Sequence, residues 1–231
     1  MKTKVFVPAL PVFVLLFISC TVTNKNNSDK SPPASNKKNI VNSKSTEKPW
    51  TSTTKNSPNE KYGNTYALVS RANEINNYAR QNGYSTKYCF LIDMSLASGR
   101  NRFFVYDLEK KSVAYSGLVA HGCCNERFIS HPVFSNTSGS GCSSLGKYKV
   151  GAFYRGQWGK SCRLYGLDKS NSNAYRRAVV IHGNGWVEDK EIYPRVLINS
   201  FGCPMVSYRF LDQLSRIIEH SEKPILLWIY R

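Results

Sequence analysis

The sequence predicts a mainly β fold with two flanking α-helices, in a single domain over residues 64–231. Short runs rich in β-branched and aromatic residues recur through this part of the chain, and Gly, Asn, Lys and Asp separate them. Two stretches near its ends instead carry apolar residues at helical spacing. The length of 231 residues and the hydrophobic content of 41% are sufficient for one domain that buries a core.

The first predicted element is a helix over residues 66–82. Apolar side chains recur along one face of it, at Leu68, Ala72, Ile75 and Ala79. Gly83 follows directly, and glycine commonly ends a helix because it accepts the left-handed conformation that the last turn requires. We therefore expect an amphipathic helix to precede the strands.

Strands are predicted next, from period-two alternation and from the turn residues that separate the apolar runs. The candidate ranges are 88–92, 102–106, 112–115, 147–154, 163–165 and 178–181. A second helix is expected from Ser207, whose hydroxyl suits the N-cap position, to His220. A buried closing strand is expected over residues 225–230.

The first residues of the chain are not expected to belong to this domain. Lysines precede an apolar run over residues 5–18, which predicts a secretion signal peptide over residues 1–19. Ser19 and Cys20 then resemble the cleavage box of bacterial lipoproteins, in which Cys20 becomes the lipidated N-terminus. An ordinary signal peptide is the alternative, because Phe17 stands where that box usually has leucine. We expect an exported protein, lipid-anchored to a bacterial membrane and facing the periplasm and cell wall.

Residues 20–63 predict a disordered tether. They are rich in Ser, Thr, Asn, Lys and Pro, and such a segment cannot bury enough apolar surface to offset its backbone entropy. The chain has a formal net charge of +17, and both the tether and the domain are basic. This charge fits a polyanionic partner. Because the chain carries an export signal, we expect anionic lipids and acidic cell-wall polymers as partners and no nucleic acid.

Cys203 and His182 are the first candidates for chemistry. Cys203 lies in the segment 200–204, which reads Ser-Phe-Gly-Cys-Pro, and His182 follows a short apolar run and precedes Gly183. A cysteine is a nucleophile only as its thiolate, and an imidazole can accept the proton. From their positions alone, a structural cysteine and a core histidine are the more common case.

Six segments in a fixed order extend this pattern. They are Leu-Ile-Asp-Met-Ser at 91–95, Val-Ala-His-Gly at 119–122, Phe-Ser-Asn at 134–136, Ser-Ser-Leu-Gly at 143–146, Val-Ile-His-Gly at 180–183 and Ser-Phe-Gly-Cys-Pro at 200–204. Together, over roughly residues 85–231, the chain resembles the YkuD-type L,D-transpeptidase catalytic-domain proteins, in the branch whose nucleophile motif reads Ser-x-Gly-Cys-Pro. The resemblance implies a β-sandwich or barrel-like domain that needs no cofactor and acts on peptidoglycan stem peptides.

The resemblance also implies a role for each matched residue. Cys203 would be the nucleophile, His182 its base, and the carbonyl of Gly183 would orient the imidazole. Ser200 and Gly202 complete the motif, and the amides of Gly202 and Cys203 would form an oxyanion hole. The implied reaction passes a tetrapeptide stem through a thioester to an amine, or to water as in an L,D-carboxypeptidase.

Two positions depart from the wider superfamily. Phe201 stands where a histidine is common, and Met205 stands where an arginine is common, two residues after the cysteine. A guanidinium that binds a stem carboxylate must therefore come from elsewhere, with Arg209, Arg195, Arg155 and the Tyr154 region as candidates. A non-catalytic peptidoglycan-binding lipoprotein of the same fold is the alternative function. A basic nucleic-acid-binding protein is a third reading, and it requires that the N-terminus is not an export signal.

The remaining cysteines and histidines have less specific readings. Disulfides are allowed in an exported protein, but no pairing follows from the sequence for the five cysteines Cys89, Cys123, Cys124, Cys142 and Cys162. His121 and Gly122 repeat the His-Gly signature, and we expect them in or beside the cleft, with a strand-end histidine as the alternative. These spacings, with His131, match no usual zinc pattern, so no metal is expected. The sequence does not define an oligomeric state.

Overall fold

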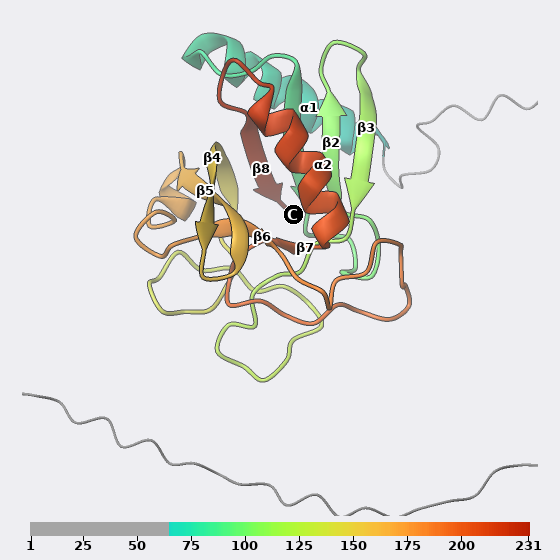
Figure 1. Ribbon diagram of the computed structural model, residues 1–231, viewed down its shortest axis with the longest axis vertical. Helices are drawn as coiled ribbons and strands as arrows, with labels where there is room; N and C mark the ends of the chain where they lie inside the picture. The colour runs from blue at the N-terminus through green and yellow to red at the C-terminus, as the bar shows by residue number, and fades with distance from the viewer. Residues whose placement is uncertain (1–64) are drawn as a thin grey trace, which may run out of the picture. The chain divides into compact units, whose positions relative to one another are not determined.

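The structure is a computed structural model that describes residues 65–231 (Figure 1). The predicted signal peptide at 1–19, the lipidation site Cys20 and the predicted tether at 20–63 lie outside the described residues. The described part contains two α-helices and eight strands. Within it, neither helix has the length and apolar character needed to cross a membrane.

Eight strands form one barrel-like sheet in the order β3-β2-β1-β8-β4-β5-β6-β7. Their bounds are β1 Tyr88–Asp93, β2 Phe103–Asp107, β3 Ser112–Gly117, β4 Gly146–Gly156, β5 Gly159–Gly166, β6 Val180–Gly183, β7 Met205–Val206 and β8 Leu226–Tyr230. Neighbouring strands are antiparallel except for the pairs β1–β8 and β6–β7, which are parallel. The mainly β fold predicted from the sequence is confirmed, and the last strand in the chain lies in the interior of the sheet.

The centre of the sheet is buried on both faces because a helix covers each face. On one side, Phe90 of β1 and Leu227 of β8 pack with Leu214 of helix α2 (Tyr208–Glu219). On the other side, Leu91 and Trp228 pack with helix α1 (Thr65–Asn82), whose contacting residues are Leu68, Ala72, Ile75 and Ala79. Successive side chains of a strand point to opposite faces, so strands covered on both faces need the continuous apolar runs that β1 and β8 carry.

Helix α2 begins where the sequence predicts. The Ser207 hydroxyl caps it by accepting a hydrogen bond from the Phe210 amide at 3.1 Å. Such a cap contributes about 1 kcal/mol to stability. His220 forms the C-cap, and its amide donates to the Arg216 carbonyl at 3.2 Å. The helix therefore has a defined start directly after β7, close in sequence to Cys203.

The strand that carries the candidate base starts and ends later than predicted. The sequence predicts a strand at 178–181, whereas β6 spans Val180–Gly183. Ala178 has a φ of 54°, which is a left-handed turn conformation that an extended strand cannot contain. His182 therefore lies inside β6, where it pairs in register with Met205 of the unpredicted strand β7.

A long irregular segment connects β3 to β4 and lies against the chain around Cys203. Three isolated bridges fix this segment, the 118–145 loop: Ala120 pairs with Met205, Gly122 with Ser200, and Phe134 with Ser143. In Figure 1 this loop and the orange segments that follow β6 gather at one end of the sheet. The candidate site residues lie at this end.

Candidate active site

Cys203 lies in a tight turn, the Cys203 loop (residues 200–204), that the Ser200 hydroxyl holds together. Ser200 Oγ accepts a hydrogen bond from the Gly202 amide at 3.2 Å and donates one to the Cys203 carbonyl at 2.7 Å. Gly202 has a φ of +107°, which L-residues rarely adopt, and a Cβ there would lie 2.6 Å from the Cys142 carbonyl oxygen. Only glycine fits this position without a shift of the backbone.

The Gly202 amide already has a hydrogen-bond partner in this structure. Because it already donates to Ser200, it would have to exchange that partner to stabilise an oxyanion. The expected oxyanion role of Gly202 therefore requires a rearrangement of the Cys203 loop, whereas its role in forming the turn is evident from its φ.

His182 is fixed by its own strand. Its Nδ1 lies 3.2 Å from the Gly183 carbonyl oxygen, so Nδ1 carries the proton that it donates, and Nε2 is left as the acceptor. The imidazole is buried, and the indole of Trp158 stacks on it with ring centroids 5.7 Å apart. Burial lowers the pKa of His182 below its ordinary value, and the hydrogen bond to Gly183 offsets part of that shift. The imidazole is therefore neutral at neutral pH.

Cys203 and His182 line the same hollow, so the structure brings the two candidate residues together. This base-side hollow has a volume of about 140 Å³, and its other lining residues include Trp158, Asn199 and Met205. Burial raises the pKa of the Cys203 thiol, while a hydrogen bond from the Val180 backbone and the positive charges of Arg177 and Arg163 lower it in part. With the pKa of the thiol raised and that of the imidazole lowered, the resting pair is a neutral thiol and a neutral imidazole.

The predicted pair His121 and Gly122 is not among the residues that line the base-side hollow. His121 is 1% exposed, its Nδ1 accepts from Arg102 Nη2 at 2.9 Å, and its Nε2 faces the Asn199 amide at 3.3 Å. Burial, together with the positive charge of Arg102, lowers the pKa of His121 to about 4. His121 is thus a neutral core residue that supports the start of the Cys203 loop, because its carbonyl accepts a hydrogen bond from the Ser200 amide at 2.9 Å.

Gly122 approaches the Cys203 loop backbone to backbone. A Cβ at this position would lie 2.2 Å from the Gly141 carbonyl oxygen and 2.8 Å from Gly202 Cα. Its amide donates to Ser143 Oγ at 3.0 Å, and that hydroxyl donates to the Gly202 carbonyl at 3.3 Å. Gly122 is therefore a packing position for the turn that carries the thiol.

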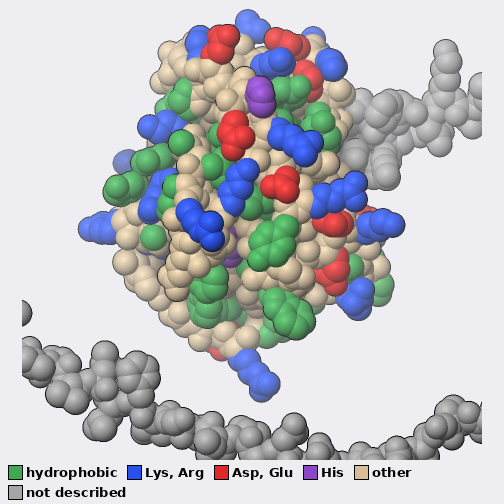
Figure 2. Space-filling view, viewed as in Figure 1, with side chains coloured by type: hydrophobic (Ala, Val, Ile, Leu, Met, Phe, Trp, Pro, Cys, Tyr) green, Lys and Arg blue, Asp and Glu red, His purple; other side chains and the backbone are tan. Residues whose placement is uncertain are grey.

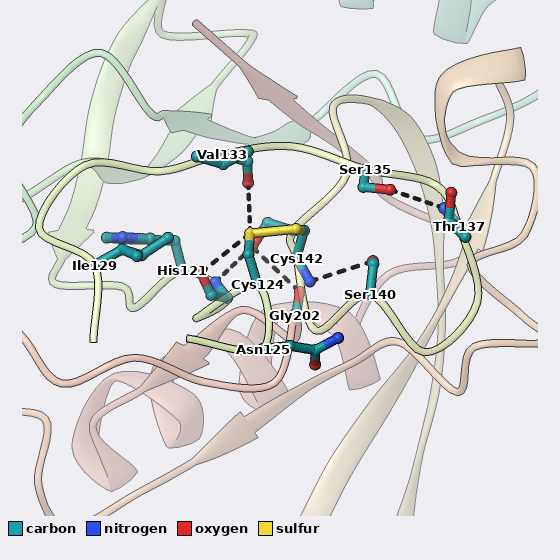
Figure 3. Close-up of a disulfide and its surroundings, with 12 residues drawn as sticks. His121, Cys124, Asn125, Ile129, Val133, Ser135, Thr137, Ser140, Cys142 and Gly202 are labelled. Carbon is teal, nitrogen blue, oxygen red and sulfur yellow. Dashed lines mark hydrogen bonds between the residues drawn. A yellow bond between two sulfur atoms is a disulfide. The ribbon is translucent and has the colours of Figure 1, made fainter. Parts of the chain in front are cut away.

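A disulfide braces the 118–145 loop at the same place. Cys124 and Cys142 are bonded, and Figure 3 shows the bridge beside Gly202 and His121. Three other cysteines of the described part, Cys89, Cys123 and Cys162, are buried free thiols. Within residues 65–231, no group of three or more His, Cys, Asp or Glu side chains could hold a metal ion.

The four predicted carboxylate-binding candidates do not line the base-side hollow. Arg155 and Tyr154 line a separate hollow on the β4–β5 hairpin, Arg195 lies 4.0 Å from Glu188 in an ion pair, and Arg209 is exposed on α2. A basic residue close to the Cys203 loop, Arg177, was not predicted from the sequence. Arg177 donates to the Cys142 carbonyl, and its Nη2 would lie 3.2 Å from a Cβ at Gly202.

Trp158 was also missed by the sequence reasoning. It lies in the two-residue turn between β4 and β5, flanked by the paired residues Gly156 and Gly159, and it is 50% exposed. An aromatic residue between glycines in a hairpin turn is unusual, because turn positions normally carry small polar residues. This pattern could have identified Trp158 as a candidate site residue. The turn places the indole over the imidazole of His182, which lies on strand β6.

Comparisons with known proteins give the following matches. A family model described as the L,D-transpeptidase catalytic domain matches residues 59–230. Among curated proteins, none matches the chain.

Several solved structures are similar to this chain. The helical cell shape determining protein Pgp2 from Campylobacter jejuni is 11% identical, with a TM-score of 0.42, and the match covers 62% of this chain and 47% of that protein. An L,D-transpeptidase from Xylanimonas cellulosilytica is 13% identical, with a TM-score of 0.36 and coverage of 67% and 68%. One from Mycobacterium smegmatis is 11% identical, with a TM-score of 0.37 and coverage of 63% and 59%. The chain spans about half the length of the Campylobacter jejuni protein.

Proposed function

Because the chain belongs to the YkuD-type L,D-transpeptidase catalytic-domain family, we propose that it is a peptidoglycan L,D-transpeptidase with Cys203 as its nucleophile and His182 as its base. The observation that carries the proposal is the shared hollow, which Cys203 and His182 both line. The bond from His182 Nδ1 to the Gly183 carbonyl supports it, because it directs the basic Nε2 away from its own backbone. The carbonyl takes the place that a carboxylate has in many catalytic triads.

The first step acylates the enzyme. His182 Nε2 accepts the thiol proton as Cys203 Sγ forms a bond to the carbonyl carbon of the third stem residue, and the π electrons move to the carbonyl oxygen. The Cys203 amide is the oxyanion donor that we propose. When the tetrahedral intermediate collapses, the bond to the terminal D-alanine breaks, and that amine leaves with the proton from His182. A thioester on Cys203 remains.

The second step regenerates the thiol. An amine of another stem gives its proton to His182 and attacks the thioester carbonyl, which forms the cross-link and expels the Cys203 thiolate. The imidazolium then returns its proton to sulfur. Water in place of the amine gives a trimmed tripeptide stem, so the same site supports L,D-carboxypeptidase activity.

The resting protonation state requires that proton transfer accompanies attack. A preformed thiolate–imidazolium pair is disfavoured, because burial raises the pKa of the Cys203 thiol and lowers that of His182. The thiolate is therefore generated when substrate enters and His182 receives the proton in the same step. This order keeps the thiol protected from reagents that react only with thiolates.

The test of this proposal uses tetrapeptide-bearing peptidoglycan fragments and the full-length chain. We expect the wild-type protein to release D-alanine and to give a cross-linked or trimmed product by mass spectrometry, and Cys203→Ala to give neither while it unfolds at the same temperature. Turnover by a folded Cys203→Ala variant would overturn the assignment. A wild-type protein that binds the fragments but releases no D-alanine and makes no product would instead be a peptidoglycan-binding lipoprotein.

We also propose that the chain is exported and held on a bacterial membrane by lipid at Cys20. The apolar run before Ser19-Cys20 supports this, and the family's substrate lies outside the cytoplasm. Figure 2 shows Lys and Arg side chains spread over the visible face with acidic side chains among them, which fits a solvated surface better than a nucleic-acid groove. Incorporation of a labelled fatty acid into the wild type and not into Cys20→Ala would support the anchor, and equal labelling would contradict it.

A further inference from the structure

Cys203 lies where two hollows meet. The base-side hollow of about 140 Å³ contains His182 and Trp158. A second hollow of about 310 Å³, here called the arginine-side hollow, is lined by Arg176 and Arg177 together with polar and glycine residues of the 118–145 loop. Cys203 and Phe201 are the two residues that line both, so Cys203 borders two hollows with different lining residues.

The chemistry of the proposed reaction assigns different parts of the substrate to these two spaces. The leaving amine receives a proton from His182, and the attacking amine gives a proton to the same imidazole. Both amines must therefore come within hydrogen-bond reach of His182, and His182 lines only the base-side hollow. The acyl group that stays on Cys203 through both steps must then extend away from this hollow, and the arginine-side hollow is the space open to it.

The arginine-side hollow has the charge that an anionic acyl group needs. Two guanidiniums line it, and no acidic side chain is among its lining residues. The retained part of a stem peptide carries carboxylates that take no part in the reaction, on its second residue and, where the third residue is a diamino diacid, on that residue too. A planar guanidinium binds such a carboxylate through two parallel hydrogen bonds.

The two arginines differ in what they can offer to a ligand. Arg177 is half-buried and committed to the protein: Nη1 donates to the Ser135 carbonyl at 2.8 Å, and Nη2 donates to the Cys142 carbonyl. Arg176 is exposed, and the bond from its Nη2 to Asn173 Oδ1 uses only part of a group that carries five N–H donors. The Asn173 bond holds the guanidinium at the rim of the hollow and leaves donors for a ligand.

We propose that the arginine-side hollow binds the acyl-donor stem and that Arg176 recognises a carboxylate on the part of the stem that stays attached to Cys203. This inference rests on the proposed transpeptidase function and assigns the donor specificity of its site. Arg176 thus supplies the guanidinium for the stem carboxylate. An arginine two residues after the nucleophile cannot supply it in this chain, because Met205 occupies that position. Arg177 has a different part, since its bonds hold the Cys142 backbone against Gly202.

The kinetic test compares Arg176→Gln with the wild type on four tetrapeptide stems: free, amidated at the second residue, amidated at the third, and amidated at both. Because a charge-assisted hydrogen bond from an exposed group is lost, we expect kcat/KM for acylation to fall about 5- to 10-fold on the free stem. We expect no loss on the stem whose amidation removes the recognised carboxylate, which identifies that carboxylate. Arg80→Gln, at an exposed position on α1, is the matched control and should match the wild type on all four stems.

Three outcomes of this test would overturn the inference. The first is an equal loss on all four stems, which indicates a structural effect, and the second is no loss on any stem. The third is a normal acylation rate with slower transfer of the thioester to the amine in single-turnover experiments, because that would place Arg176 on the acceptor side.

A binding measurement separates failure of this inference from failure of the proposed function. In the Cys203→Ala background, calorimetry with the free stem should show weaker binding, by a similar factor, when Arg176→Gln is added. If the wild type makes no product but Arg176→Gln still weakens binding of the free stem alone, the transpeptidase proposal fails and carboxylate recognition stands. If product forms and binding is unaffected by Arg176→Gln, carboxylate recognition fails and the transpeptidase proposal stands.

Discussion

Replacing Gly122 by alanine would press a methyl group into the backbone that supports Cys203. The added Cβ would lie 2.2 Å from the Gly141 carbonyl oxygen, 2.8 Å from the Cys142 carbonyl carbon and 2.8 Å from Gly202 Cα. All three are backbone atoms, so none can swing aside as the end of a long side chain can. Restoring an ordinary contact of 3.4 Å from 2.2 Å requires a movement on the order of 1 Å.

The magnitude follows from this geometry. Overpacking of a close contact costs about 1–3 kcal/mol, and the clash with three backbone atoms places Gly122→Ala near the upper end. The lower entropy of the unfolded chain with alanine offsets about 0.4–1 kcal/mol. The net loss of about 2 kcal/mol corresponds to a decrease in Tm of about 4–8 °C for a domain of this size. A shift of the Cys203 loop by about 1 Å would also lower turnover about 100-fold.

Thermal unfolding and the rates of D-alanine release and iodoacetamide alkylation would be measured together. Gly185→Ala is the matched control, because a Cβ there would meet only Tyr208 Cε2, at an ordinary 3.7 Å. We expect the control to behave like the wild type. A Gly122→Ala protein with the Tm, turnover and alkylation rate of Gly185→Ala would refute the claim that Gly122 supports the Cys203 loop by close backbone contact.

Two further predictions concern His182 and the disulfide. Trp158→Ala exposes the His182 imidazole to water, so the lowered pKa of His182 should rise toward about 6.5. Because only the neutral imidazole accepts the thiol proton, the acid limb of the pH profile of kcat/KM should move to higher pH. Trp158→Phe keeps an aromatic ring and should shift the acid limb of the profile less. If the acid limb of Trp158→Ala lies at the same pH as that of the wild type, the indole does not desolvate His182. Replacing Cys124 and Cys142 by serine removes a bridge across 18 positions and should cost about 3 kcal/mol of unfolding free energy, and an unchanged thermal midpoint would contradict it.

Much of the fold could be predicted because most of its helices and strands are specified by residues that lie close together in the sequence. The helix that ends at Asn82 and the capped start of α2 at Ser207 follow from spacing and cap residues alone. Strand boundaries are less local. The displacement of β6 by two residues arises from the left-handed turn at Ala178 and from pairing with β7, which is only two residues long and has no periodicity to detect.

The candidate site could be predicted in part. The ordered motifs point to Cys203 and His182, and the structure places both in one hollow. Sequence order does not reveal what surrounds them, because Trp158 and Arg177 reach the site through hairpin geometry and long-range loop packing. The 118–145 loop lacks regular strands, and its contacts are set by glycines and by the Cys124–Cys142 bond, so the role of Gly122 as a packing position could be read only in three dimensions.

The bridge between Ala120 and Met205 has a consequence for self-association. Strand β7 is the last strand of the sheet, and an unprotected last strand offers free amides and carbonyls to another chain. Here the Ala120 amide donates to the Met205 carbonyl at 2.9 Å, so the 118–145 loop occupies part of that edge. The same loop packs against the turn that carries Cys203. A change that detaches it would therefore disorder the candidate active site and expose the sheet edge to aggregation at the same time.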